Sequence, residues 1–250
     1  MDTIISENEK TWDTVADQFI DSSALPVWGP FGVGKNLKLI PNIKGKTFLE
    51  IGCGSGRSIK YLTNHGAKTV YGMDLSNVQL KESARYNKKE IDTGKVKLFK
   101  SAMEKKIRIP KVDYVISVYA IGWTPDPKTT LKNIYSYLKP GGLFIWSWDH
   151  TFFTNVQYRD KEFILKYSYH EEKLHAFKNW KKEGTVANVA YRKTATWFQL
   201  LRNAGFEIIG YYEPKPVDLS RASTDPTKHY SIQKAEKVPS TFIFVCKKVV

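Results

Sequence analysis

The chain has 250 residues, of which 42% are hydrophobic, and a formal net charge of +14. This length suits one α/β domain, with room for a sizeable insertion. No run approaches the ~18 apolar residues of a membrane span, and the N-terminus lacks the basic start and apolar stretch of a signal peptide. Cys53 lies in a glycine-rich turn and Cys246 in an apolar terminal strand, which argues against a disulfide. The chain has no clustered Cys/His pattern, which argues against a metal site. We therefore expect a soluble, cytoplasmic protein without a bound metal.

The positive charge is spread along the chain rather than gathered in a tail. Residues 1–150 carry 22 basic and 15 acidic side chains, and residues 151–250 carry 17 and 10. Only seven basic residues are arginine, the preferred side chain for phosphate and base contacts. The densest stretch, Lys81 to Lys111, has 11 basic and 4 acidic residues. A solvated lysine-rich face explains this stretch, and a nucleic-acid surface is the alternative.

The first predicted element is an amphipathic helix from Asn8 to Ile20. Trp12, Val15, Ala16 and Phe19 recur in it at a spacing of three to four residues, which places them on one face. This face either contacts a ligand or packs on the core.

A short apolar strand is predicted to run into a glycine-rich turn. Thr47 to Ile51 is β-branched and aromatic, as in a buried parallel strand, and Gly52, Gly54 and Gly56 follow at alternate positions. Ser58 to His65 then has helical spacing. Glycines permit a tight turn and let a ligand lie against the backbone, where the N–H groups of the helix start face it.

An acidic residue lies at the position where a nucleoside site needs one. A second strand, Thr69 to Met73, ends in Asp74, 18 positions after Gly56. In dinucleotide-type sites an acid about 20 residues beyond the glycines holds the ribose hydroxyls. The pairing predicts nucleoside binding, and a strand-end aspartate that caps the next helix is the alternative. The alternate glycines do not match the G-x-G-x-x-G fingerprint of NAD-binding sites.

The remaining elements alternate up to residue 150. Strands are expected at 96–99, 112–119 and 143–148, and helices at 35–40, 76–90 and 127–138. After residue 190 we expect a helix at 194–204, strands at 206–211 and 241–247, and a long exposed loop over 215–239. The aromatic-rich segment 151–190 interrupts the alternation and reads as an insertion, either a pocket cover or a subdomain with its own small core.

The pattern Glu50-x-Gly52-x-Gly54-x-Gly56 resembles motif I of the class I S-adenosylmethionine (SAM) methyltransferases, and specifically the small-molecule, methyltransferase-11-like family. The resemblance covers residues 8–213 and the last strand. It implies a Rossmann-like α/β fold with a seven-stranded, mostly parallel sheet of order 3-2-1-4-5-7-6, the last strand antiparallel, and helices on both faces. Residues 1–250 would be one domain, with lid helices in 1–45 and a helical, aromatic substrate cap in 151–190.

The resemblance also implies which residues bind SAM and its product S-adenosylhomocysteine. The glycine turn would support the amino-acid end of the cofactor, and Asp74 would hold the ribose. The full set of expected cofactor-binding residues is Trp12, Glu50, Gly52, Cys53, Gly54, Gly56, Arg57, Asp74, Leu75, Ala102, Met103, Val118 and Tyr119. Ser101 stands where the family often has an aspartate, so one adenine contact differs.

The acceptor side offers three candidate catalytic residues. Tyr119 ends the fourth strand, and Asp149 and His150 follow the fifth, so all three are expected at the carboxyl-end cleft. The segment around Trp123 is similar to a family motif, but Gly122 stands where a histidine is often found. A base at that position is therefore not available to this protein.

The sequence favours a small-molecule methyltransferase and leaves other functions open. An RNA or protein methyltransferase that uses the lysine-rich surface is one alternative, although no RNA module is appended. A SAM-binding protein without catalysis is a second, because the glycines and Asp74 fit it equally well. An NAD-dependent oxidoreductase is a more distant third. No metal is expected, and the sequence does not determine the oligomeric state.

Overall fold

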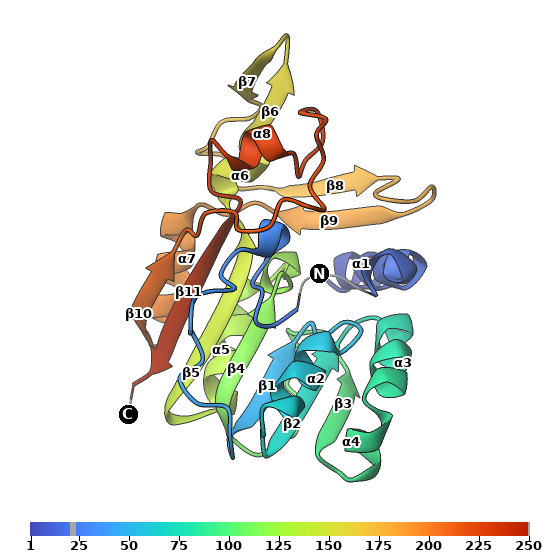
Figure 1. Ribbon diagram of the computed structural model, residues 1–250, viewed down its shortest axis with the longest axis vertical. Coiled ribbons are helices and arrows are strands. Elements are labelled where there is room, and N and C mark those ends of the chain that lie inside the picture. The colour runs from blue at the N-terminus through green and yellow to red at the C-terminus, as the bar shows by residue number, and fades with distance from the viewer. Residues whose placement is uncertain (21–23, 250) are drawn as a thin grey trace.

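A twisted seven-stranded sheet forms the centre of the computed structural model, which describes residues 1–20 and 24–249 (Figure 1). Its strands are β1 (Thr47–Ile51), β2 (Thr69–Asp74), β3 (Val96–Lys100), β4 (Val112–Val118), β5 (Leu138–Asp149), β10 (Phe206–Tyr212) and β11 (Thr241–Lys248). They lie in the order β10-β11-β5-β4-β1-β2-β3. Only β11 runs antiparallel to its two neighbours in this sheet as described. The predicted order 3-2-1-4-5-7-6 is confirmed.

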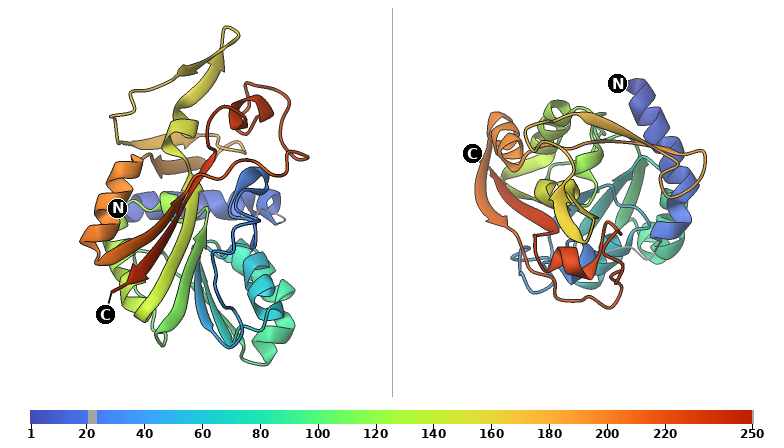
Figure 2. Two further views of the ribbon diagram at one scale, coloured as in Figure 1. Left: turned by 60° about the vertical axis from the view of Figure 1, so that its left-hand side comes forward. Right: turned by 90° about the horizontal axis from the view of Figure 1, so that it is seen from above.

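Helices cover both faces of the sheet (Figure 2). They are α2 (Arg57–Asn64), α3 (Asn77–Tyr86), α4 (Lys88–Asp92), α5 (Pro127–Tyr137) and α7 (Thr194–Asn203). Because successive strand residues point to opposite faces, Leu49 and Ile51 pack in the core with α5 and α7, while Phe48 packs against α2. The central strands are buried on both faces, as expected for parallel strands between two helical layers.

Helix α1 (Asp2–Val15) lies across the end of the sheet rather than on a face. It begins six residues earlier than predicted, and a 3₁₀ turn η1 (Ala16–Phe19) continues it. The predicted short helix at 35–40 is wrong: these residues form turns and irregular structure. The segment between Gly34 and Pro41 is too short to form a stable helix without strong packing. Part of the proposed lid, residues 21–23, lies outside the described residues.

The insertion after β5 is mostly β structure, so its predicted helical character is corrected. It contains one short helix, α6 (Thr151–Asn155), followed by the hairpin strands β6 (Val156–Arg159) and β7 (Glu162–Leu165), then β8 (Leu174–Lys178) and β9 (Val186–Ala190). Asp160 and Lys161 have φ angles of 51° and 67°, the left-handed turn conformation that matches strand twist in a two-residue hairpin. The sequence prediction relied on aromatic content and overlooked this turn.

The segment before β11 is also corrected, because it is not a fully exposed loop. The N–H groups of Val217 and Asp218 donate to the Phe31 carbonyl at 2.9 Å. A short helix, α8 (Ile232–Ala235), then packs Ala235 against Phe31 and Phe153. The segment therefore folds back over the carboxyl end of the sheet (Figure 1).

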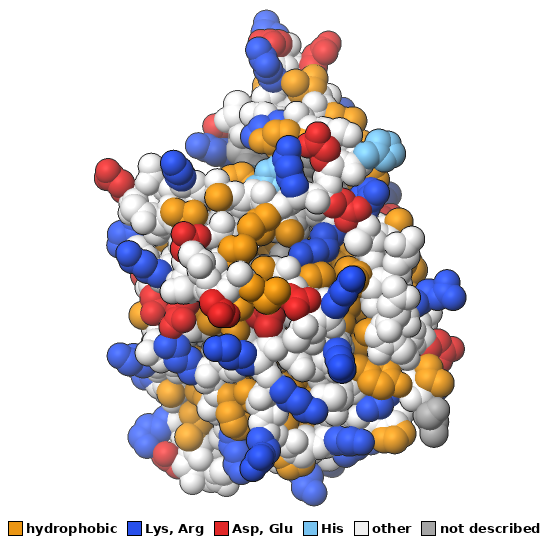
Figure 3. Space-filling view, turned by 180° about the vertical axis from the view of Figure 1, so that it is seen from behind, with side chains coloured by type: hydrophobic (Ala, Val, Ile, Leu, Met, Phe, Trp, Pro, Cys, Tyr) orange, Lys and Arg blue, Asp and Glu red, His pale blue; other side chains and the backbone are white. Residues whose placement is uncertain are grey.

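On the face of the molecule that Figure 3 shows, basic side chains are scattered, with acidic ones among them. Within the lysine-rich stretch, Lys88 pairs with Asp92 at 2.7 Å and Lys100 pairs with Glu9 at 2.6 Å. Such exposed pairs contribute little stability, but they reduce the local positive field. This arrangement fits the solvated-face interpretation of the stretch.

Candidate active site

A cavity of about 530 Å³ lies beyond the carboxyl ends of the central strands. This is the place where ligands bind in open α/β sheets, and the volume is typical of small-molecule sites. Its described lining includes ten of the predicted cofactor and catalytic residues: Trp12, Gly52, Gly54, Asp74, Leu75, Ala102, Met103, Val118, Tyr119 and Asp149. The structure therefore brings these predicted residues together around one cavity.

The glycine turn approaches the cavity with its backbone. Gly52 has a φ of 70°, and a Cβ built on it would lie 2.1 Å from the Cβ of Ala120, so a side chain does not fit there. Around Gly54 a Cβ would meet no atom closer than 3.7 Å, which leaves open space above that residue. The turn is thus tight beneath Gly52 and open at Gly54, as a ligand cradle requires.

Asp74 connects β2 to the glycine turn. Its Oδ2 accepts a hydrogen bond from the Gly54 N–H and its Oδ1 accepts one from the Ser76 N–H, both at 2.8 Å. Burial raises the pKa of Asp74, against the opposing effect of these backbone donors. Each oxygen keeps a further lone pair for a ligand hydroxyl. Ser101, the departure from the family pattern, also lines the cavity.

The described lining does not include four of the predicted cofactor-binding residues: Glu50, Cys53, Gly56 and Arg57. They support the turn from below. The Cys53 side chain is buried against Gly72, and the Arg57 guanidinium lies 4.0 Å from the Tyr86 ring centroid. These contacts show a supporting role for the four residues, and their direct contact with the cofactor stays a prediction.

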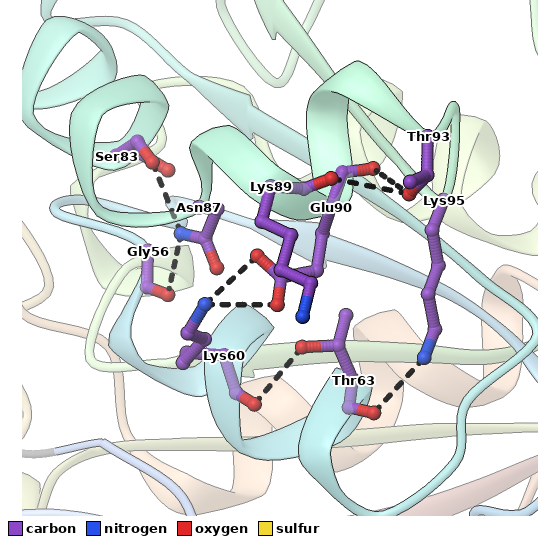
Figure 4. Close-up of polar contacts among 9 residues, drawn as sticks. All are labelled: Gly56, Lys60, Thr63, Ser83, Asn87, Lys89, Glu90, Thr93 and Lys95. Carbon is purple, nitrogen blue, oxygen red and sulfur yellow. Dashed lines mark hydrogen bonds and ion pairs between the residues drawn. The ribbon is translucent and has the colours of Figure 1, made fainter.

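Gly56 shows how that support is built (Figure 4). The Asn87 side-chain amide, at the break between α3 and α4, donates to the Gly56 carbonyl at 3.1 Å and to the Ser83 carbonyl at 3.0 Å. A Cβ on Gly56 would lie 2.2 Å from the Ser83 Oγ. This glycine is needed because α2 and α3 meet here, and the contact fixes the start of α2.

Two buried oxygens next to the turn fit a cofactor that carries hydrogen-bond donors and a positive charge. Gln79 lines the cavity, and its Oε1 has no hydrogen-bond partner among the described residues. The Glu50 Oε2 beneath the turn is likewise without one in the described part of the chain, and burial raises the pKa of Glu50 to about 8. Buried polar atoms normally have partners, so a ligand with an ammonium group suits this end.

The acceptor end of the cavity contains Asp149 and several tyrosines. The Tyr230 hydroxyl donates to both Asp149 oxygens, at 2.9 and 3.1 Å, and the Tyr119 hydroxyl bonds the Thr241 hydroxyl. Tyr191 also lines this end. The sequence analysis did not predict Tyr230 as a site residue, because segment 215–239 was expected to be an exposed loop. The only indication in the sequence was that the residue is aromatic.

His150, in contrast, faces away from the cavity, and its expected place in the cleft is corrected. Its Nδ1 accepts a hydrogen bond from the Phe152 N–H at 3.2 Å, so it caps α6. Its Nε2 lies 2.9 Å from a carboxylate oxygen of Glu213. Burial lowers the pKa of this imidazole. Its partners give it a structural role at the start of the insertion.

Three tryptophans from separate elements meet over the cavity. Trp12 of α1 lies 5.1 Å from Trp123 and 5.5 Å from Trp180, and the last two lie 5.3 Å apart, between ring centroids. Edge-to-face contacts of this kind add to the stability from buried area. Trp123 belongs to the 3₁₀ turn η3 (Ile121–Trp123) and Trp180 to the β8–β9 turn. No sequence pattern indicates that these distant rings meet.

Helix α1 is attached to the hairpin by side chains that satisfy the outer edge of β9. The Asn8 amide donates to the Asn188 carbonyl at 3.0 Å and accepts from the Asn188 N–H at 2.8 Å. The Thr11 hydroxyl likewise donates to the Val186 carbonyl and accepts from the Val186 N–H. An edge strand is thereby covered, and α1 and β8–β9 form one lid.

Replacing Asn8 with alanine is expected to loosen this lid, because it leaves two buried backbone groups of Asn188 without their partners. The cost is about 1–3 kcal/mol, which increases local opening. Hydrogen exchange of the Asn188 amide should become about 5- to 100-fold faster. Thr14→Ala is the control, since the Thr14 hydroxyl bonds only the Lys10 carbonyl of its own helix in the described chain. Unchanged exchange in Asn8→Ala would contradict the attachment.

The absence of a histidine at position 122 has a steric reason. A Cβ on Gly122 would lie 1.7 Å from Cε2 of the Trp148 indole, which fills the space that a larger side chain needs. Gly122→Ala is therefore expected to displace Trp148 and cost about 1–3 kcal/mol of stability through overpacking. Urea unfolding measures the loss, and near-ultraviolet circular dichroism reports the indole. A variant with unchanged stability and spectrum would show that Trp148 lies elsewhere.

In residues 1–20 and 24–249, no group of three or more His, Cys, Asp or Glu side chains is arranged to hold a metal ion. In the same residues, no helix has the length and apolar character needed to cross a bilayer.

The methyltransferase domain family matches residues 33–211 of this chain. The chain is 27% identical to an uncharacterized protein of Haemophilus influenzae, over 85% of each. It is 28% identical to the ubiquinone biosynthesis O-methyltransferase of Coxiella burnetii, over 54% of this chain and 64% of that enzyme. A Listeria monocytogenes protein assigned as a SAM-dependent methyltransferase has a similar structure, with a TM-score of 0.69, 26% identity, and coverage of 85% of this chain and 95% of that one. The chain therefore belongs to the methyltransferase domain family, within the class I SAM-dependent methyltransferases, and its cofactor is SAM.

Proposed function

We propose that this enzyme methylates a small-molecule acceptor bound in the enclosed cavity beside the cofactor. The observation that carries the proposal is the lid: α1, η3 and the β8–β9 turn close the cavity with three mutually packed tryptophans. A covered, aromatic-walled pocket suits a small, partly apolar ligand. A polymer substrate needs an open groove instead. In this view the chain acts as one domain, and its lid residues in 1–45 and cap residues in 151–190 enclose the acceptor.

The residues around the glycine turn would hold the cofactor. Asp74 would accept hydrogen bonds from the ribose hydroxyls, the backbone at Gly52 and Gly54 would take the amino-acid end, and Ala102 and Met103 would contact the adenine. SAM supplies a methyl group on a sulfonium sulfur. The protein then contributes positioning and exclusion of water, which are the main terms when the donor is already activated.

Tyr119 would act as a hydrogen-bond donor rather than as a base. Burial, together with the negative charge of Asp149, raises the pKa of the Tyr119 hydroxyl well above its usual range. It therefore keeps its proton at neutral pH. Asp149 is the acid at this end that can accept a proton or a hydrogen bond from the acceptor. Of the three predicted catalytic residues, Asp149 is therefore the one that we propose as the base.

The alternative of an RNA or protein substrate finds less support. On the face that Figure 3 shows, the basic side chains are dispersed and interspersed with acids, whereas nucleic-acid enzymes gather them in a continuous patch. Similarity to an O-methyltransferase of ubiquinone biosynthesis also favours a small acceptor.

The test uses SAM with a radiolabelled methyl group and three separate acceptor pools: a small-molecule metabolite extract, total RNA and total protein. The proposal expects label in the small-molecule fraction and stoichiometric S-adenosylhomocysteine. Label in RNA or protein would replace the proposal with the alternative. Cofactor binding without label in any pool would favour a non-catalytic SAM-binding protein.

A further inference from the structure

The cavity is acidic although the chain as a whole is strongly basic. Three carboxylates line it, those of Asp74, Glu104 and Asp149, against one lysine among the described lining residues, Lys181. Asp74 belongs to the cofactor end. The Glu104 carboxylate accepts a hydrogen bond from the Thr124 hydroxyl. Asp149 is therefore the charge that faces the acceptor.

No strong cation neutralises Asp149 from within the cavity. Its side chain is 15% exposed, and the nearest basic nitrogen is Nε2 of His229 at 3.9 Å. Among the described residues, no lysine or arginine nitrogen lies within 4.0 Å of its oxygens. Lys234 lies behind it, over the Phe153 ring at 4.1 Å, and is not part of the described lining. Burial lowers the pKa of Lys234 to about 8, so Lys234 stays mostly protonated at neutral pH and offsets the Asp149 charge only from outside the cavity.

Aromatic rings line the same cavity as the carboxylate. The Tyr119 and Trp148 rings lie 5.7 Å apart, and the Tyr191 and Phe177 rings lie 6.2 Å apart, between centroids. Ring faces attract cations, most strongly where water is excluded. An apolar alcohol would gain from the same rings by burial alone, but an ammonium group gains from the rings and the carboxylate together.

We propose that the acceptor is an amine that is protonated in solution and is carried on a flat, apolar body. Its ammonium group would pair with Asp149, and its body would lie between the aromatic rings. This inference rests on the proposed small-molecule function and names its substrate class. The nitrogen must lose a proton before it can accept a methyl group. Asp149 Oδ2 would take that proton, and His229, whose side chain is 42% exposed, would pass it to solvent.

The test compares matched probes that share one body and differ in one group: 2-phenylethylamine, 2-phenylethanol and phenylacetate, and likewise tryptamine, tryptophol and indole-3-acetate. Calorimetric titration is carried out on the protein with and without S-adenosylhomocysteine. We expect at least one amine to bind about 10- to 100-fold more tightly than its alcohol, the usual gain from a hydrogen bond to a charged group. The carboxylates should bind least.

Asp149→Asn should remove the preference for the amine, because asparagine keeps the shape and the Tyr230 contact but not the charge. The matched control is Asp160→Asn in the β6–β7 turn, where the aspartate side chain is 88% exposed and asparagine tolerates the positive φ. The control should keep the preference. Thermal unfolding of each variant verifies folding, and the wild-type comparison decides the inference if Asp149→Asn does not fold.

Four results would overturn the inference: equal binding of alcohol and amine, preference for the carboxylate, no binding of any amine, or an unchanged preference in Asp149→Asn. If the protein binds S-adenosylhomocysteine and gives any of these four results, the amine inference is refuted and the proposed function is not. Failure to bind S-adenosylhomocysteine refutes the proposed function instead, and the titrations without it still decide whether the Asp149 end selects amines.

Discussion

Replacing Glu50 with glutamine is expected to stabilise the ligand-free protein by several kcal/mol at pH 8 and by little at pH 5. Burial raises the pKa of Glu50 from 4.5 to about 8, so the folded state holds a proton that the unfolded state releases. Stability from this group is full below pH 4.5 and is lost as the pH rises towards 8. At pH 8 the loss is on the order of 4 kcal/mol, since one pKa unit corresponds to about 1.4 kcal/mol.

Urea unfolding at pH 5 and pH 8 measures the effect. The difference between wild type and Glu50→Gln reports Glu50 together with Asp74 and Cys53, whose charges are coupled to it, because groups elsewhere titrate alike in both proteins. Glu207→Gln, at an exposed position of β10, should show no such change. If the gap between wild type and Glu50→Gln is the same at both pH values, Glu50 titrates normally and the buried carboxylate is misplaced.

Replacing Asp74 with alanine is expected to weaken SAM binding about 10- to 100-fold. The carboxylate would bind the ribose hydroxyls, and hydrogen bonds to charged groups contribute about 1.5–3 kcal/mol. The substitution also removes the acceptor for the Gly54 and Ser76 N–H groups, so the turn loses part of its support. Calorimetric titration with SAM gives the change in affinity.

Two further variants separate the ribose contact from the loss of the turn. Asp74→Asn keeps an acceptor oxygen for the backbone but loses the charge, so it should retain the melting temperature better than Asp74→Ala. Asp92→Ala removes an exposed acid that pairs with Lys88 in α4, and SAM affinity should stay at the wild-type value. Wild-type affinity in Asp74→Ala would mean that the cofactor does not reach the end of β2.

The sheet was predictable because its signals are local. The apolar strand Val112–Val118 contrasts with the polar segment before it and with the periodic helix α5 after it, and Gly141 and Gly142 lie just after that helix, near the start of β5. The structure of the insertion was not predictable, since its aromatic content is compatible with a helical core or with hairpins. The positive φ angles at Asp160 and Lys161 decide in favour of hairpins, and neither residue type signals them strongly.

The cofactor end of the site could be predicted, because its residues lie close together in sequence. The acceptor end could not be predicted in this way. Gly52, Gly54 and Asp74 belong to one strand–turn–helix–strand unit whose geometry is fixed by local rules. Tyr230 and Trp180 come from distant segments and reach the cavity through tertiary packing alone. His150 shows the converse: its position after β5 was read correctly, but the start of α6 turns its ring towards Glu213.

Calorimetric titration of the purified protein with SAM, S-adenosylhomocysteine and NAD, in parallel, tests the assignment most directly. We expect micromolar binding of the two adenosyl-sulfur ligands and none of NAD, because the turn leaves room at Gly54 and offers acidic partners at Glu50 and Asp74 rather than a pyrophosphate site. Binding of NAD alone, or of none of the three, would contradict the methyltransferase account and leave only the Rossmann-like fold.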